Sequence, residues 1–234
     1  MKKGDERRGQ ILACAERLFY QKGYENTSIQ DILQELNCSK GGFYHHFDSK
    51  LQLLEAITAQ RTLAAREELT RAVEECPGDA VQRLNVLFAK GLPWRAEDME
   101  FAGLILRVGY RDGSLQIREC VKRALLDNAR EPLERIIQDG IEQKLFYTRY
   151  PEEIGELLLA IYANINDEIA MRLAAGLEGE RSVMQLLDRL EACRYAVEQL
   201  LGAPYGSVVL FDPLELPDLL RRLSAQARRQ GEKR

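Results

Sequence analysis

The chain has 234 residues and a net charge of −4, from 33 basic and 37 acidic side chains. Its composition, 45% hydrophobic and 30% charged, is ordinary for a globular protein. It contains no run of 18 apolar residues, so we expect no membrane span. Its first residues lack the apolar stretch of a secretory signal. We therefore expect a cytoplasmic protein.

Cysteine and histidine usage argues against a disulfide framework and against a metal centre. The five cysteines form no C-x-x-C pair, and their odd number fits a reducing compartment; they are Cys14, Cys38, Cys76, Cys120 and Cys193. The only two histidines are adjacent, and neighbours on a helix point about 100° apart. We find no nucleophile elbow, phosphate loop or paired metal ligands. We expect neither an enzyme nor a cofactor.

The first elements predict a helix at about 5–22 and then two short helices joined by a tight turn. Thr27 and Ser28 are good helix-capping residues. The apolar positions that follow recur with helical spacing; they are Ile29, Ile32, Leu33 and Leu36. Asn37 tolerates the left-handed conformation that ends many helices, so it allows a sharp turn.

The second short helix, predicted at about 39–47, presents an unusual outer face. Ser39 can cap it, and Phe43 and Phe47 can face inward together. The residues left outside are Lys40, Gly41, Gly42, Tyr44, His45 and His46. Two glycines cost a helix roughly 1 kcal/mol each, which a purely structural surface hairpin would rarely carry. The pattern favours a helix-turn-helix unit whose second helix meets the major groove of DNA.

The remainder of the chain predicts a helical body. We expect helices at about 49–75, 79–90, 97–110, 114–128, 132–144, 151–174 and 180–201, with Pro132 opening a new helix. The only strand-like run, at 208–211, is interpreted as an extended segment or short arm. A short amphipathic helix is expected at about 217–229. The predicted fold class is all-α.

The charge distribution permits DNA binding in spite of the negative total. Residues 1–60 hold eight basic and eight acidic side chains, so the rest of the chain carries the whole −4. A few cations on one face suffice for phosphate contacts. The candidates are Lys2, Lys3, Arg7, Arg8, Lys40 and Lys50.

Residues 7–55 resemble the N-terminal domain of the TetR family of bacterial transcriptional regulators. The matching elements run in order: Ile11-Leu12-Ala13, Ala15, Leu18-Phe19, Lys22-Gly23-Tyr24, Thr27, Ile29, Ile32, Ser39-Lys40-Gly41, Phe43-Tyr44-His45-His46-Phe47 and Ser49-Lys50. The turn departs from the family's frequent Ala-Gly-Val, with Leu36-Asn37-Cys38 instead. Gly42 stands where the family often has a hydroxyl or methyl group.

The resemblance implies a helix-turn-helix DNA-binding domain at 1–48 and a helical ligand-binding and dimerisation domain at 49–234. The expected DNA-binding residues are Thr27, Ser28, Ser39, Lys40, Gly41, Gly42, Tyr44, His45, His46 and Lys50. Cys38, in the turn, is either a redox switch or a small apolar filler, and the filler is the simpler interpretation.

The last two long helices carry more apolar surface than one packed side needs, which predicts a two-fold interface. The candidates are Ile154, Leu158, Ile161, Ile165, Leu186, Leu190 and Val197. Packing within one chain is the alternative. The resemblance favours a homodimer, because the family dimerises through these helices.

The resemblance also implies a small-molecule effector of unknown identity in the body. Aromatic side chains with a few polar groups suit a mostly apolar ligand. The candidates are Phe88, Trp94, Met99, Phe101, Leu104, Arg107 and Tyr110, with an ordinary aromatic core as the alternative. The expected function is a homodimeric repressor on a palindromic double-stranded operator, released by this effector. The alternative is a DNA-bound adaptor that recruits a protein partner and senses no ligand.

Overall fold

The computed structural model describes residues 3–91, 99–175, 180–211, 218 and 221–222. The chain is all-α, as predicted, and no strand occurs in the described residues. The helices are α1 (Lys3–Lys22), α2 (Ile29–Glu35), α3 (Lys40–Tyr44), α4 (Lys50–Glu74), α5 (Ala80–Lys90), α6 (Met99–Ile105), the π-helical segment η2 (Leu106–Arg111), α7 (Leu115–Glu142), α8 (Pro151–Ala175) and α9 (Glu180–Leu201).

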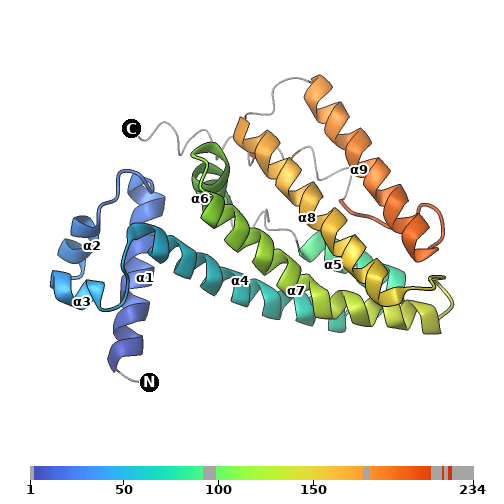
Figure 1. Ribbon diagram of the computed structural model, residues 1–234, viewed down its shortest axis with the longest axis horizontal. Helices are drawn as coiled ribbons and strands as arrows, with labels where there is room; N and C mark the ends of the chain where they lie inside the picture. The colour runs from blue at the N-terminus through green and yellow to red at the C-terminus, as the bar shows by residue number, and fades with distance from the viewer. Residues whose placement is uncertain (1–2, 92–98, 176–179, 212–217, 219–220, 223–234) are drawn as a thin grey trace.

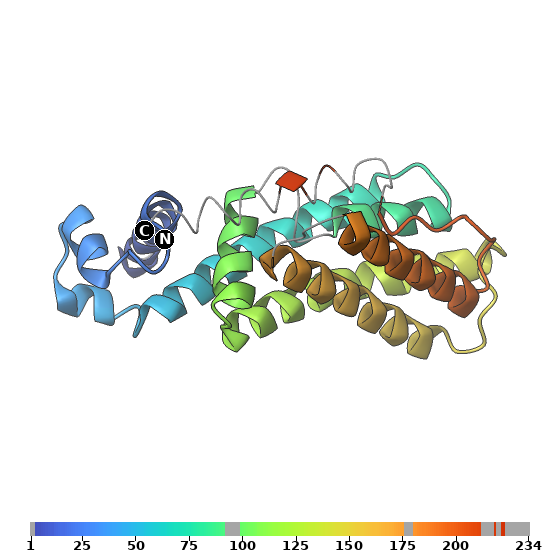
Figure 2. The ribbon, with the colours of Figure 1, turned by 90° about the horizontal axis from the view of Figure 1, so that it is seen from above.

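Helices α1–α3 form a small unit at one end, here called the head (Figure 1). Helix α4 leads out of the head and joins the body, which comprises α4–α9 (Figures 1 and 2). Several helices begin close to where the sequence predicts, because capping side chains fix their first turns. Ser28, Ser39, Ser49, Asp79 and Ser114 each accept a hydrogen bond from the backbone N–H three residues later.

The prediction of two helices separated at Pro132 is wrong. Helix α7 runs without interruption from Leu115 to Glu142, with Pro132 inside it. A proline costs a helix interior about 3 kcal/mol, since it lacks an N–H donor and crowds the preceding turn. The buried side chains on both sides of it, including Leu125, Ala129, Leu133 and Ile136, pack α7 into the body. Tertiary packing therefore overrides the local signal.

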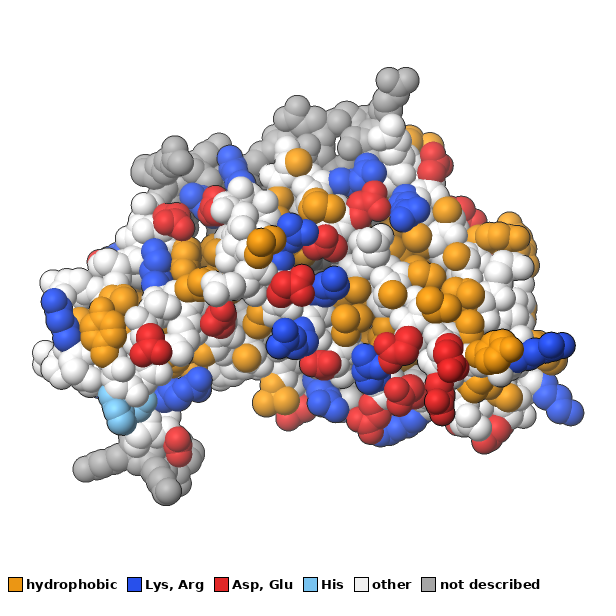
Figure 3. Space-filling model, in the orientation of Figure 1, with side chains coloured by type: hydrophobic (Ala, Val, Ile, Leu, Met, Phe, Trp, Pro, Cys, Tyr) orange, Lys and Arg blue, Asp and Glu red, His pale blue; other side chains and the backbone are white. Residues whose placement is uncertain are grey.

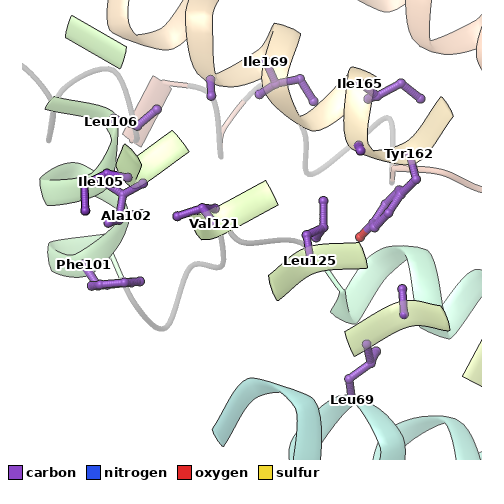
Figure 4. Packing of buried hydrophobic residues seen from close by; sticks show 14 of the residues in the cluster. Leu69, Phe101, Ala102, Ile105, Leu106, Val121, Leu125, Tyr162, Ile165 and Ile169 are labelled. Atoms are coloured by element: carbon purple, nitrogen blue, oxygen red, sulfur yellow. The ribbon is translucent and has the colours of Figure 1, made fainter. Parts of the chain in front are cut away.

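The body core lies where α6, α7 and α8 meet. Figure 4 shows Phe101, Ala102, Ile105 and Leu106 facing Val121 and Leu125 of α7 and Tyr162, Ile165 and Ile169 of α8. Each of these side chains is at most 9% exposed. Tyr162 donates its hydroxyl hydrogen to the Phe88 carbonyl at 3.3 Å, which satisfies a buried polar group.

Residues 207–210, part of the predicted extended arm, lie over α5 and α9 without forming a strand. The Asn85 carboxamide donates to the Ser207 carbonyl at 2.9 Å and accepts from the Val209 N–H at 2.8 Å. The buried Glu198 carboxylate accepts from the Val208 N–H at 3.1 Å. The side chains of Asn85 and Glu198 thus bond the backbone groups that a neighbouring strand would otherwise bond. The predicted helix at 217–229 falls almost wholly outside the described residues.

None of the described helices has the length and hydropathy needed to cross a bilayer. No group of three or more His, Cys, Asp or Glu side chains in the described part of the chain is placed to hold a metal ion.

Candidate nucleic-acid interface

The head is built around two phenylalanines that fix α3 on the rest of the unit. Phe43 and Phe47 are 0% and 2% exposed, and their ring centroids lie 6.2 Å apart. They pack in a cluster with Ile32 and Leu33 of α2 and with the apolar face of α1. Helix α3 ends at Tyr44, earlier than predicted, and the Phe47 N–H still donates to the Phe43 carbonyl at 3.1 Å. The predicted inward orientation of both rings is confirmed.

The turn between α2 and α3 has the conformation that the sequence predicts. Asn37 has φ +47°, in the left-handed region, and the Cys38 N–H donates to the Leu33 carbonyl at 3.0 Å. Arg7 of α1 donates to the Leu36 carbonyl at 3.4 Å. The angle between α2 and α3 is therefore fixed by backbone geometry and by a contact from α1.

The outer face of α3 is open to a partner. Ser39, Lys40, Gly41, Gly42 and His45 are exposed, and the Tyr44 side chain is 49% exposed. A Cβ atom added at Gly41 would meet nothing within 4 Å, and one at Gly42 would meet only the Ser39 hydroxyl at 3.4 Å. Bare backbone therefore forms this surface, and a large ligand such as DNA can approach it closely.

The two histidines extend the same edge of the head, where they are pale blue in Figure 3. Their ring centroids lie 5.0 Å apart, with His45 exposed and His46 half-buried. Both rings are placed to donate or accept hydrogen bonds beside α3.

Most cations of the described head are used within the protein. Lys22 pairs with Asp31 at 2.7 Å, and Arg17 pairs with Glu35 at 2.9 Å. The Lys22 partner and the hydrogen bonds from Ser28 hold the pKa of the Asp31 carboxyl well below its usual range. The Arg8 guanidinium lies 5.2 Å from the centroid of the Phe47 ring. Lys40 has no ion-pair partner among the described residues, so its charge is available to a phosphate.

Two predicted DNA-binding residues have structural roles instead. Thr27 is only 1% exposed, and its hydroxyl donates within the head, 2.8 Å from the Gly23 carbonyl. Lys50 donates to the Tyr24 carbonyl at 2.7 Å and lies 4.3 Å from the centroid of the Tyr24 ring. Burial lowers the pKa of the Lys50 ammonium. The sequence pattern indicated that both positions matter, but it could not distinguish a residue that stabilises the head from a residue that contacts DNA.

Ser28 stays at the exposed entrance of α2, where it caps the helix and is bonded reciprocally with Asp31. The structure thus brings seven of the ten predicted residues together on or beside the exposed side of α3: Ser39, Lys40, Gly41, Gly42, Tyr44, His45 and His46.

The residues predicted to line an effector pocket lie in two neighbouring parts of the body. Phe88 packs on Tyr162, with ring centroids 5.3 Å apart. Met99, Phe101 and Leu104 lie on α6, and Arg107 and Tyr110 lie in η2. Trp94 lies outside the described residues. Phe88, Phe101 and Leu104 are buried in the core cluster, so their packing role is established.

Five of the seven predicted dimer-interface residues are buried within the single chain, which corrects that prediction. Leu158, Ile165, Leu186, Leu190 and Val197 are at most 7% exposed. Ile154 and Ile161 alone of the seven are half-buried. The regular spacing of apolar residues along a helix indicates the face that packs against the core of its own chain. The prediction therefore selected this inward face.

One functional candidate was missed by the sequence analysis altogether: a side-chain junction between head and body. Arg61 of α4 donates from Nε to the Glu16 carboxylate of α1 at 2.7 Å. The Tyr20 hydroxyl donates to the same carboxylate at 2.7 Å, and the Arg61 guanidinium lies 5.8 Å from the centroid of the Phe101 ring on α6. Nothing in the local pattern around residue 61 indicates the contacts of Arg61 with Glu16 and Phe101, which lie 45 and 40 positions away in the sequence.

Comparisons with known proteins agree with this architecture. Residues 11–57 match the model of bacterial regulatory proteins of the tetR family. An uncharacterised HTH-type transcriptional regulator in the lacX 3′ region of Lactococcus lactis is 32% identical over 129 residues, which are 55% of this chain and 61% of that protein. The HTH-type regulator YuxN of Bacillus subtilis is 31% identical over 121 residues, 48% of this chain and 38% of the relative. The matched region thus spans less than two thirds of either relative.

Solved structures extend the likeness in fold beyond the head. A TetR-family transcriptional regulator from Pectobacterium atrosepticum aligns with 87% of this chain and 100% of its own, at a TM-score of 0.60 and 22% identity. Residues 11–57 are therefore similar to the tetR family of bacterial regulatory proteins, and the described chain shares the fold of a TetR-family regulator.

Proposed function

We propose that the protein is a transcriptional regulator that reads a palindromic operator with α3 as a homodimer and is released by a small-molecule effector. The observation that carries the proposal is the outer face of α3. Two glycines expose its backbone, while Lys40 and Tyr44 stand beside them and both phenylalanines are turned inward. A helix that served packing alone would gain stability from alanine at these positions.

Within this proposal, α3 lies in the major groove. Ser39 and the first N–H groups of α3 face phosphate, Lys40 supplies a positive charge, and Tyr44 and His45 reach phosphates or base edges. Among the described residues of the head few cations are free, which implies a modest number of phosphate contacts. We therefore expect weak binding to random DNA and a shallow dependence on salt compared with strongly basic binding domains.

The homodimer would form through the exposed faces of α8 and α9, and not through the buried stripe that the sequence analysis selected. Leu157 and Met171 on α8 are 50% and 45% exposed, and Met184 and Tyr195 on α9 are 56% and 51% exposed. Figure 3 shows such apolar side chains among charged ones along these two helices. Ala160 and Ala192 are exposed small residues that allow close helix packing. Two copies would present this surface to each other across a two-fold axis.

The effector would bind near α6, η2 and α8, where polar groups meet the apolar core. Arg118 donates to both carboxylate oxygens of Asp167, at 3.1 and 2.8 Å, and its guanidinium lies 4.8 Å from the Tyr110 ring centroid. A π-helical segment such as η2 is costly and is frequent at functional sites. An effector that moved α6 would act on Phe101 and, through Arg61, on α1 of the head. It must bind one head arrangement more tightly than the other.

The test is in vitro selection of random DNA duplexes by the purified full chain. We expect a palindromic sequence to be enriched by the native protein and by Lys122→Ala, a matched loss of an exposed lysine on α7. Tyr44→Ala and Lys40→Ala should each lose or strongly weaken the enrichment. If no sequence is enriched, or if all four proteins enrich the same sequence equally, α3 is not the reading element.

Dimerisation is tested separately by sedimentation equilibrium. Leu157→Arg should shift the chain toward monomer, because it places a charge in the proposed interface. Leu115→Arg alters a leucine that is 68% exposed at the start of α7 and should leave the oligomeric state unchanged. A monomeric native protein, or the same response from both variants, would rule out this interface.

A further inference from the structure

Exposed tyrosines gather at the end of the body opposite the head, where α7 turns into α8 and α9 ends (Figures 1 and 2). Tyr147 and Tyr150 of the α7–α8 loop are 71% and 65% exposed, and Tyr205, just after α9, is 78% exposed. Tyrosine is enriched in protein interfaces and among the residues that dominate their binding energy. These three residues, with Lys144 and Arg149 of the same loop, are here called the end surface. It shares no residue with the candidate nucleic-acid interface or with the surface proposed for the homodimer.

The fold beneath the loop fixes its backbone. Lys144 has φ +59°, in the left-handed region, and the Phe146 ring fills the space that a Cβ atom on Gly140 would need. The Tyr147 N–H donates to the Leu201 carbonyl at 2.7 Å, which joins the loop to the end of α9. The tyrosines are therefore presented on a preorganised backbone, so little conformational entropy is lost when a partner covers them.

The loop is basic as well as aromatic. Residues 143–150 include Lys144 and Arg149 and no acidic side chain. Both cations are exposed and neither forms an ion pair with a described residue, whereas Arg130 and Arg135 of α7 both do. The end surface therefore combines unpaired positive charge with aromatic rings. A partner that brings carboxylates would complement it.

Such carboxylates lie directly beside the loop on the same chain. A groove of about 650 Å³ lies between α7 and the start of α8, and its lining includes Glu134, Pro151, Glu152 and Glu153. The three glutamates are exposed, and none of them forms an ion pair with a described residue. Figure 3 shows hydrophobic and basic side chains next to a group of acidic ones at this end of the body.

The order of these residues makes the end of the body self-complementary. Arg149 and Tyr150 immediately precede Pro151, which lines the groove. A two-fold axis brings a surface onto itself, so an axis close to Pro151 would place Arg149 and Tyr150 of each copy against the groove of the other. A single axis would thus form the contact between cation and carboxylate twice.

The exposed rings offer a substantial area to a partner. An aromatic side chain buries roughly 150–250 Å², so three tyrosines with these exposures offer on the order of 400 Å² per copy. That is about half of the roughly 800 Å² that each partner buries in a standard interface. The rest would come from the loop and the groove. We therefore expect a reversible association that depends on concentration.

We propose that the end surface associates with that of a second copy of this chain, with Arg149 and Tyr150 of each copy seated in the acidic groove of the other. The occupant is a second copy because the chain itself carries the complementary charge directly beside the loop. The contact doubles the mass of whatever unit the α8 and α9 faces form. It does not depend on the proposed DNA-binding function.

The first test is sedimentation velocity of the full chain over a wide range of concentration. We expect a reversible step that doubles the mass. Arg149→Glu and Glu153→Arg should each weaken that step at least tenfold, because like charges would then face each other twice. Tyr150→Ser should weaken it as well. The matched charge reversals Lys122→Glu on α7 and Glu67→Arg on α4, at exposed positions away from the end surface, should leave it unchanged.

The second test mixes the two charge-reversed variants. In an equimolar mixture of Arg149→Glu and Glu153→Arg, a mixed pair has one native contact and one contact with both charges exchanged, so the doubling should return. Its return would also show that both variants are folded. The proposal is overturned if the native protein shows no doubling step, if the reversed variants associate as the native protein does, or if the mixture does not restore the step.

Leu157→Arg separates this association from the proposed homodimer. It should remove the contact through α8 and α9 and leave the doubling through the end surface, whereas Arg149→Glu should do the reverse. If Leu157→Arg and Arg149→Glu removed the same step, the end surface would not be a separate interface and the proposal would be overturned. None of these measurements involves DNA, so their failure is distinguishable from failure of the proposed regulator.

Discussion

Arg61 of α4 and Glu16 of α1 form an ion pair at 2.7 Å between body and head, and the Phe101 ring of α6 lies 5.8 Å from the same guanidinium. Tyr20 donates to the Glu16 carboxylate as well. Three helices therefore meet at one charged group. Arg61 thus contacts both the Phe101 ring of α6 and the Glu16 carboxylate of α1, so a shift of α6 would change the surroundings of a group that holds α1.

A double-mutant cycle tests this junction. Arg61→Met and Glu16→Gln should each lower the free energy of unfolding, and their coupling should be about 1 kcal/mol, since a part-buried charged hydrogen bond contributes that much. Urea unfolding of the native protein, the two single variants and the double variant gives the coupling free energy. The matched cycle on the exposed pair Arg17 and Glu35 should give a smaller coupling. Equal couplings in the two cycles would show that the junction is only an ordinary surface pair.

Gly41→Ala separates stability from DNA binding. The added methyl meets open space, so the helix should gain about 0.5–1 kcal/mol in free energy of unfolding. The same methyl would stand between α3 and a DNA groove, and we expect affinity for an enriched duplex to fall roughly tenfold, about 1.4 kcal/mol. Thermal unfolding and fluorescence anisotropy measure the two effects.

The control for that substitution is Gly155→Ala on α8, where a Cβ would make an ordinary contact with Ile137 at 3.6 Å. It should also stabilise the protein, but DNA affinity should stay unchanged. Undiminished affinity in Gly41→Ala would mean that the bare backbone of α3 does not approach DNA.

Asp31 gives the head a dependence on acid. Lys22 and Ser28 depress the pKa of this carboxyl in the folded protein, so the unfolded chain takes up a proton first as pH falls. The contribution of the Asp31 carboxylate to the free energy of unfolding is present above about pH 4, the pKa of an aspartate in the unfolded chain, and is lost progressively below it. Asp31→Asn should therefore flatten the loss of stability between about pH 4 and pH 2. Lys22→Met should flatten it partly, because it removes the leading cause of the depressed pKa. Circular dichroism measures the folded fraction of each variant at each pH. If both variants lose stability below about pH 4 as steeply as the native protein, the depressed pKa of Asp31 is not the cause of the acid dependence.

Asn37 tests the turn itself. Its φ of +47° is tolerated by asparagine but favours glycine. Asn37→Gly should keep or slightly raise the melting temperature, whereas Asn37→Val should lower stability by about 1–2 kcal/mol. If valine were accepted without loss, the left-handed turn would not be needed to set the angle of α3.

Local chemistry made the head the most predictable part of the molecule. The caps at Ser28, Ser39 and Ser49 and the turn at Asn37 act within three or four residues, so one stretch of sequence specifies them. The same short-range reasoning failed at Pro132, where packing of a long buried face outweighs the cost of one proline. It also placed Thr27 and Lys50 at the interface, because a pattern of residue types does not say which way a side chain points.

Long-range contacts could not be predicted at all. The Arg61–Glu16 pair and the Asn85 contacts to residues 207–209 join distant segments with no periodic signal. The dimer prediction selected the inner stripe of α8 and α9, which is buried within the single chain. The exposed apolar residues, such as Leu157 and Tyr195, become recognisable only when burial is known.

The most direct test of the central claim is photo-cross-linking from position 44 to sheared double-stranded DNA. With p-benzoylphenylalanine in place of Tyr44, the full chain should form a covalent adduct with DNA upon irradiation. The same amino acid in place of Tyr147, which is 71% exposed in the loop between α7 and α8, should form none. An adduct from position 44 alone would show that α3 meets DNA. No adduct from position 44, or equal adducts from both positions, would contradict the account.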